Sequence, residues 1–149
     1  MKLHLIRSTI LLALVLFGFV PARAGCEYPI RSFTDANGKK TGYFISGERL
    51  AATPEWVFDG TTLPPLSLPD AYRIANRWIA QKYPKMDSFR MRSYSVDEGG
   101  NSGAPNRWYY TLDFVGTMDG TEVYGGLFMA MVLMDGTIVE PREVKPNED

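Results

Sequence analysis

The apolar and polar positions between Ser67 and Pro84 repeat with the period of an α-helix. The apolar positions follow the i, i+3, i+4, i+7 and i+8 spacing of a single helix face, namely Ala71, Ile74, Ala75, Trp78 and Ile79. Ser67 and Asp70 have the spacing of an N-terminal capping box, and Tyr83 precedes a proline, which ends a helix. We expect this stripe to close a core, so Trp78→Ala is predicted to cost about 3 to 5 kcal/mol.

After the helix, apolar and polar residues alternate with the period of a β-strand. Four strands are expected over residues 89–96, 107–115, 121–134 and 137–140, the third bent by two glycines and the fourth following a hairpin signal at Asp135-Gly136. The predicted fold class of residues 66–141 is α+β. One main helix packs on a curved antiparallel β-meander of about four strands, which makes two layers.

Alternation also assigns side chains to the two faces of the expected sheet. In the second strand, Trp108, Tyr110, Leu112 and Phe114 share one face, whereas Tyr109 lies on the other. We expect the helix residues Trp78 and Ile79 to meet a mixed set of sheet residues, namely Trp108, Leu112, Met129 and Met131.

The remaining segments lack such periodicity. Residues 1–24 have the basic start, apolar middle and small-x-small end of a secretory signal peptide that is removed, so we expect an exported protein, periplasmic or secreted. Residues 25–65 are predicted to form an irregular N-terminal arm with one short strand at 41–45, and residues 142–149 a polar C-terminal tail.

Charge and cysteine content narrow the choice of partners. Without Lys2, Arg7 and Arg23 of the signal peptide, 13 basic residues face 17 acidic ones, a net charge of about −4, which argues against nucleic-acid binding. Cys26, the one cysteine, directly follows the processing site. Either it is lipidated, which would anchor the chain to a membrane, or it is an unpaired thiol near the terminus.

The residues that most often carry catalysis are missing from the expected mature chain. The single histidine, His4, lies in the signal peptide, which removes His-activated nucleophiles and the common zinc sets. No motif indicates a metal or cofactor. Two carboxylates can divide acid and base roles, and candidates of that type exist, but no spacing singles out a pair. We therefore expect a protein that is not an enzyme.

Two groups of residues are candidate binding surfaces. A cationic patch on the outer helix side and first strand would combine Arg73, Arg77, Lys82, Lys85, Arg90 and Arg92, although an ordinary solvated helix face explains the same residues. Tyr94 and Tyr109 are expected on the sheet face away from the helix, where they could dock a protein or peptide. Alternatively, the N-terminal arm covers that face with Trp56 and Phe58.

The segments "LSLPDAYRIANRWIAQKYP", "RWYYTLDFV" and "VLMDGTIVEP" resemble PepSY-like, cystatin-like domains of exported bacterial proteins. The resemblance implies a noncatalytic module that binds or modulates another envelope protein or a peptidase. Two alternatives stay open. One is a hydrolase or small-ligand-binding protein that uses carboxylates in the concave face of the sheet, and the other is a structural envelope component.

Overall fold

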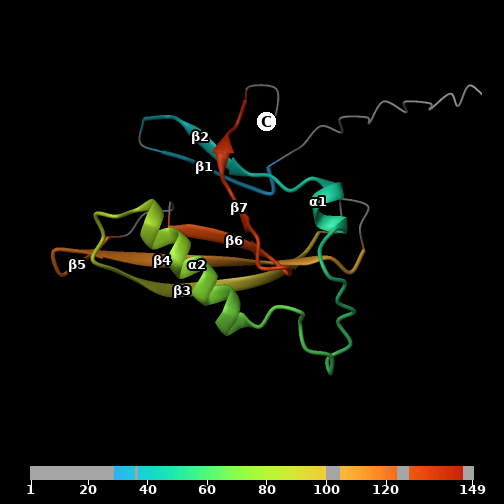
Figure 1. Cartoon of the computed structure of the whole chain (residues 1–149). Helices are drawn as coiled ribbons and strands as arrows, with labels where there is room; N and C mark the ends of the chain where they lie inside the picture. The colour runs from blue at the N-terminus through green and yellow to red at the C-terminus, as the bar shows by residue number, and fades with distance from the viewer. Residues whose placement is uncertain (1–28, 36, 100–104, 124–127, 146–149) are drawn as a thin grey trace, which may run out of the picture.

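The computed structural model describes residues 29–35, 37–99, 105–123 and 128–145 (Figure 1). The predicted signal peptide and Cys26, with its possible lipidation, lie outside these residues. The elements are, in chain order, β1 (Arg31–Thr34), β2 (Lys40–Tyr43), α1 (Gly47–Ala51), α2 (Leu68–Lys82), β3 (Ser88–Glu98), β4 (Trp108–Met118), β5 (Thr121–Val123), β6 (Met129–Leu133), β7 (Ile138–Val139) and β8 (Arg142–Glu143). Neither described helix combines the length and the apolar character needed to cross a membrane.

Helix α2 forms where the periodicity predicts it. The Ser67 hydroxyl accepts a hydrogen bond from the Asp70 amide (3.2 Å), so the expected serine cap is present. The Asp70 carboxylate reaches back to Ser67 by accepting a bond from its hydroxyl (2.6 Å). The helix stops at Tyr83, whose amide bonds Ile79. Its fully buried residues belong to the predicted stripe, namely Ala71, Ala75 and Ile79.

The predicted α+β fold, a main helix packed on an antiparallel meander, is confirmed. A five-stranded sheet has the order β3-β4-β6-β7, and β5 pairs with the far end of β4. The segment 121–134 is two strands rather than one: β5 pairs with Gly116–Met118, and β6 pairs with Tyr109–Asp113, nearer the start of β4. The predicted glycine bend lies in residues 124–127, outside the described residues.

The register of β6 corrects one expected contact. Met129 and Met131 lie opposite Asp113 and Thr111, so both methionines point away from α2. The β6 side chains on the helix side are Ala130 and Val132, in the same buried cluster as Ile79 and Leu112. The prediction that Met129 and Met131 meet the helix was therefore wrong by one position of the alternation.

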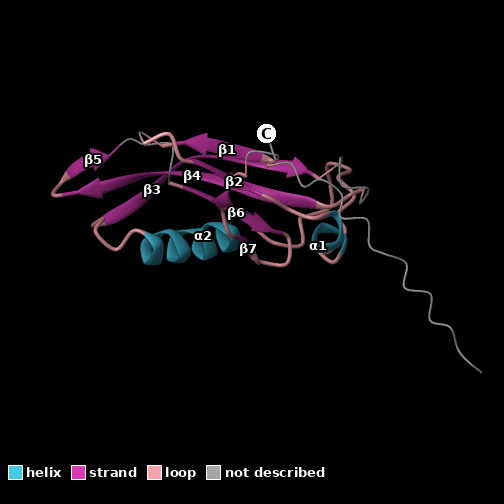
Figure 2. Cartoon of the chain, turned by 90° about the horizontal axis from the view of Figure 1, so that it is seen from above, coloured by secondary structure: helices cyan, strands magenta, loops and turns pink. Residues whose placement is uncertain are grey.

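The N-terminal arm and C-terminal tail form a second sheet that the sequence did not predict. Its strands have the order β1-β2-β8, and β2 overlaps the short strand predicted at 41–45. The tail residues Arg142–Glu143, predicted to be a polar tail, pair with this strand. This sheet packs on the face opposite α2 (Figure 2). Tyr43 anchors it, because its hydroxyl donates to the Met129 carbonyl at 2.5 Å while its ring is almost fully buried. The domain thus has three layers.

Burial of tyrosine hydroxyls makes stability sensitive to alkaline pH. Desolvation is the main cause that raises the pKa values of Tyr43, Tyr83, Tyr109 and Tyr110 above their ordinary value. These tyrosines ionise more easily in the unfolded chain, where the pKa of a tyrosine is about 10. Their contribution to the free energy of unfolding is therefore fully present below about pH 10 and is lost as the pH rises above it. Burial lowers the pKa of Lys82, so this group has the opposite effect and makes the free energy of unfolding increase as the pH rises.

We therefore expect the urea midpoint of unfolding, followed by circular dichroism, to be lower at pH 11 than at pH 8. The Tyr43→Phe variant, which lacks one of these hydroxyls, should show a smaller decrease. A midpoint that is unchanged or rises over this interval would contradict the explanation.

Candidate interaction surface

The loop between α1 and α2 carries two aromatic rings, which pack with a third ring from β4 at one end of the main sheet. The Trp56 ring makes edge-type contacts with Phe58 and with Trp108, both at a centroid distance of 5.3 Å. Trp108 belongs to β4, where it lies opposite Glu98 at the end of β3. We call residues 56–63 the aromatic loop. In Figure 1 the green segment between α1 and α2 projects beyond β3.

Hydrogen bonds hold the aromatic loop in one shape. The Trp56 indole donates to the Thr62 carbonyl (3.0 Å), and the Trp108 indole donates to the Trp56 carbonyl (2.8 Å). The Asp59 carboxylate accepts from the backbone amides of Thr61 and Thr62 (2.8 and 2.7 Å). These amides, Thr62 first, hold the pKa of Asp59 well below its usual range, so the bonds persist at neutral pH.

The aromatic loop exposes apolar side chains rather than hiding them. Phe58 is 64% exposed and Leu63 is 84% exposed, and Val57 between the two aromatic rings is also exposed. The sequence contained the signal, since apolar residues flank the Asp59-Gly60 turn. One of the two alternatives drawn from the sequence instead had Trp56 and Phe58 cover the sheet face away from the helix. Trp56 belongs to the core cluster on the helix side, which corrects that expectation.

Tyr94 and Tyr109 do not share a face. Tyr109 is only 6% exposed, because Tyr43, Ile45 and Leu50 cover it. The N-terminal arm therefore does cover this face, but with these residues and not with Trp56 and Phe58. The register of β3 shifts between Met91 and Ser93, and this β-bulge reverses the alternation that follows. Tyr94 therefore lies opposite Leu112, on the helix side, and it stays 51% exposed.

The six basic residues of the predicted patch are not brought together. Arg73 pairs with Asp70 on the exposed side of α2, where Arg77 is also exposed. Arg90 lies opposite Val115, on the sheet face away from α2, and pairs with Glu122 at 2.8 Å. The prediction that the helix and strand arginines share one surface was therefore wrong, because the sheet separates them. Arg92 is at the bulge and is exposed.

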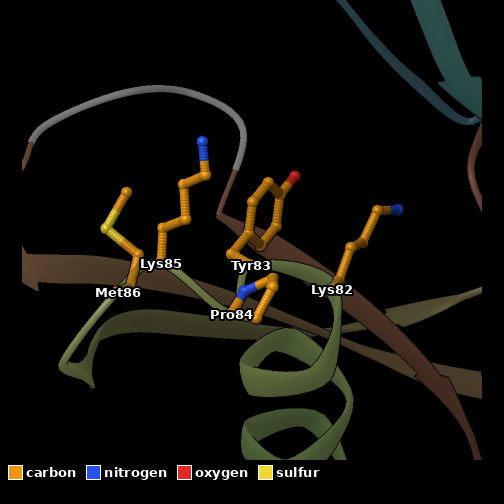
Figure 3. Close-up of a pocket in the computed structure, with 5 residues that line it drawn as sticks. All are labelled: Lys82, Tyr83, Pro84, Lys85 and Met86. Carbon is orange, nitrogen blue, oxygen red and sulfur yellow. The ribbon is translucent and has the colours of Figure 1, made fainter.

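The remaining two lysines of that patch line a shallow hollow at the C-terminal end of α2. It has a volume of about 300 Å³ and is lined by Lys82, Tyr83, Pro84, Lys85 and Met86. Figure 3 shows the polar ends of Lys82, Tyr83 and Lys85 on one side of it. Lys82 also lies 4.3 Å from the centre of the Trp78 ring. None of these lining residues is a carboxylate, the group that the hydrolase alternative uses.

Within the described ranges, no group of three or more His, Cys, Asp or Glu side chains is placed to hold a metal ion. Comparisons of the chain with protein families, with curated proteins and with solved structures give no match. The candidate interaction surface therefore rests on its own geometry alone. Its two parts are the aromatic loop and the neighbouring strand β3.

Proposed function

We propose that this chain is a small noncatalytic module that binds another protein in the cell envelope. The observation that carries the proposal is the aromatic loop, in which Phe58 and Leu63 are exposed although the backbone around them is firmly hydrogen-bonded. The PepSY-like resemblance and the export signal stay predictions and agree with such a role.

The rigidity of the aromatic loop distinguishes it from an ordinary solvent-exposed loop. Single exposed apolar residues are common, but here Val57, Phe58 and Leu63 all lie on one short segment that is held against Trp108. A side chain that is already ordered loses little conformational entropy when a partner covers it. Aromatic residues of this kind often dominate the binding energy of protein interfaces. The aromatic loop thus has the properties of a preorganised docking surface.

The proposal predicts that Phe58→Ser combined with Leu63→Asp weakens partner binding at least tenfold while the domain stays folded. Both side chains are mostly exposed, so the free energy of unfolding should change by less than about 1 kcal/mol. Binding can be located with a photo-cross-linking amino acid placed at Phe58 in cells that produce the protein. Cross-linked partners are identified by mass spectrometry.

The matched control places the same cross-linker at Arg77, which is exposed on the outer side of α2. We expect a specific adduct from position 58 and none from position 77. Equal labelling from the two positions, or an adduct from position 58 that is unchanged by Leu63→Asp, would contradict the assignment of the surface. A ladder containing only copies of this chain would instead favour a structural envelope component.

A further inference from the structure

Strand β3 is the outer strand of the main sheet and is unusually long for an edge. It has 11 residues and pairs with β4 along one side. No other described strand pairs with it. Proteins usually keep such edges short or covered, because their backbone N–H and C=O groups can pair with a further strand.

Two hydrogen bonds determine which groups of β3 point outward. The Gly99 amide donates to the Arg107 carbonyl (2.8 Å), so alternation turns the backbone groups of Asp97, Ser95 and Ser93 toward β4. The Phe114 amide donates to the Phe128 carbonyl, away from β3. Met91 lies opposite Phe114, so the backbone groups of Met91 also point outward, away from β4. The outward backbone groups are those of Phe89, Met91, Tyr94, Val96 and Glu98.

The β-bulge does not interrupt this outward row. Met91 and Tyr94 are three positions apart in β3 but lie opposite Phe114 and Leu112, which are two positions apart in β4. The outward groups therefore keep the spacing of a regular strand along the whole edge. A straight peptide can pair with all of them.

The side chains of β3 give this edge a direction. Arg90 and Arg92 lie in its first half, and Asp97 and Glu98 end it. Arg90 and Asp97 share the face away from α2, since they are opposite Val115 and Tyr109. The other face carries Met91, Tyr94 and Val96. The edge thus has a basic end, an acidic end and an apolar row between them.

We propose that β3 binds an extended peptide as an additional antiparallel strand. The peptide would place a basic residue opposite Asp97, an acidic residue opposite Arg90, and apolar residues opposite Val96, Tyr94 and Met91. Its N-terminal end would run toward Trp108 and the aromatic loop, because Glu98 pairs with Trp108. This inference rests on the proposed function and specifies the chemistry of the partner segment.

An extended peptide fits this edge better than a second copy of the chain. In Figure 1 the N-terminal end of α2 and the loop before it reach past β3 on the helix side. In a two-fold pairing of β3 strands, both molecules would bring these projecting parts to the shared edge. A peptide carries no such helix and needs room only for a single strand beside the edge of the sheet.

The test uses the synthetic peptide KVTVTVE, whose lysine is placed to meet Asp97 and whose glutamate is placed to meet Arg90. We expect it to bind at least tenfold more tightly than the charge-reversed peptide EVTVTVK, with amide NMR shifts along β3. The double variant Arg90→Asp/Asp97→Arg should invert this preference. Because Arg90 also pairs with Glu122, Glu122→Gln serves as the control and should keep the original preference.

Backbone methylation distinguishes strand addition from charge attraction alone. The amide of the peptide valine opposite Tyr94 points toward β3, so N-methylation there blocks a hydrogen bond and should weaken binding at least tenfold. The amide of the threonine opposite Ser95 points away from β3, so its N-methylation should be tolerated. Equal effects of the two methyl groups, an unchanged preference in the swapped variant, or no binding would overturn the proposal. So would a dimer of the chain that KVTVTVE dissociates. A persistent cross-link from Phe58 in these cases would leave the proposed function intact.

Discussion

Replacing Ile79 with alanine is expected to lower the free energy of unfolding by about 3 to 4 kcal/mol. Ile79 is completely buried, in the cluster where α2 packs on Leu112 and Val132. Removing three methyl or methylene carbons there leaves a cavity that the rigid sheet cannot close. The loss is a large part of the 5 to 15 kcal/mol that stabilises a typical domain. Urea unfolding followed by circular dichroism measures it.

Trp78→Ala is the comparison that tests where the centre of the core lies. Trp78 is only half-buried, its indole donates to Glu140 at 2.6 Å, and the Lys82 ammonium lies over its ring. We expect a cost of about 2 kcal/mol, below the 3 to 5 kcal/mol that the apolar stripe alone predicts. If Trp78→Ala proves more destabilising than Ile79→Ala, this description of the core is wrong.

Tyr43→Ala is expected to detach the three-stranded sheet from the main sheet and to cost about 3 to 4 kcal/mol. The side chain fills the space between β2 and the main sheet, and its hydroxyl donates a hydrogen bond to the Met129 carbonyl. Without it, the cover over Tyr109 is weakened. Hydrogen exchange should therefore accelerate in residues 31–45, and Tyr109 should become accessible to solvent.

The matched variant Tyr43→Phe keeps the ring and removes only the hydroxyl. It leaves the Met129 carbonyl without this donor, which should cost about 1 to 2 kcal/mol, and the slow exchange of residues 31–45 should remain. Tyr43→Phe exchanging as fast as Tyr43→Ala would show that the hydrogen bond, and not the packing of the ring, holds the second sheet.

The candidate interaction surface was only partly predictable from the sequence, and the reasons can be traced to single residues. Tyr94 was correctly identified as an exposed aromatic side chain, but the bulge beside Ser93 turned it to the helix side. Tyr109 was predicted on the correct face but proved to be covered. Phe58 and Leu63 were not recognised as a surface, because their exposure depends on the way Trp108 and Asp59 hold the loop.

The sequence by itself determined helix α2 and the antiparallel meander, since both depend on local periods, caps and turns that neighbouring residues supply. Only the tertiary structure decided the second sheet, because the pairing of β2 with Arg142–Glu143 joins segments about a hundred residues apart. It also decided which aromatic residues reach solvent. Alternation assigns a side chain to a face, but a single inserted residue reverses that face, and a distant segment determines whether the face is covered.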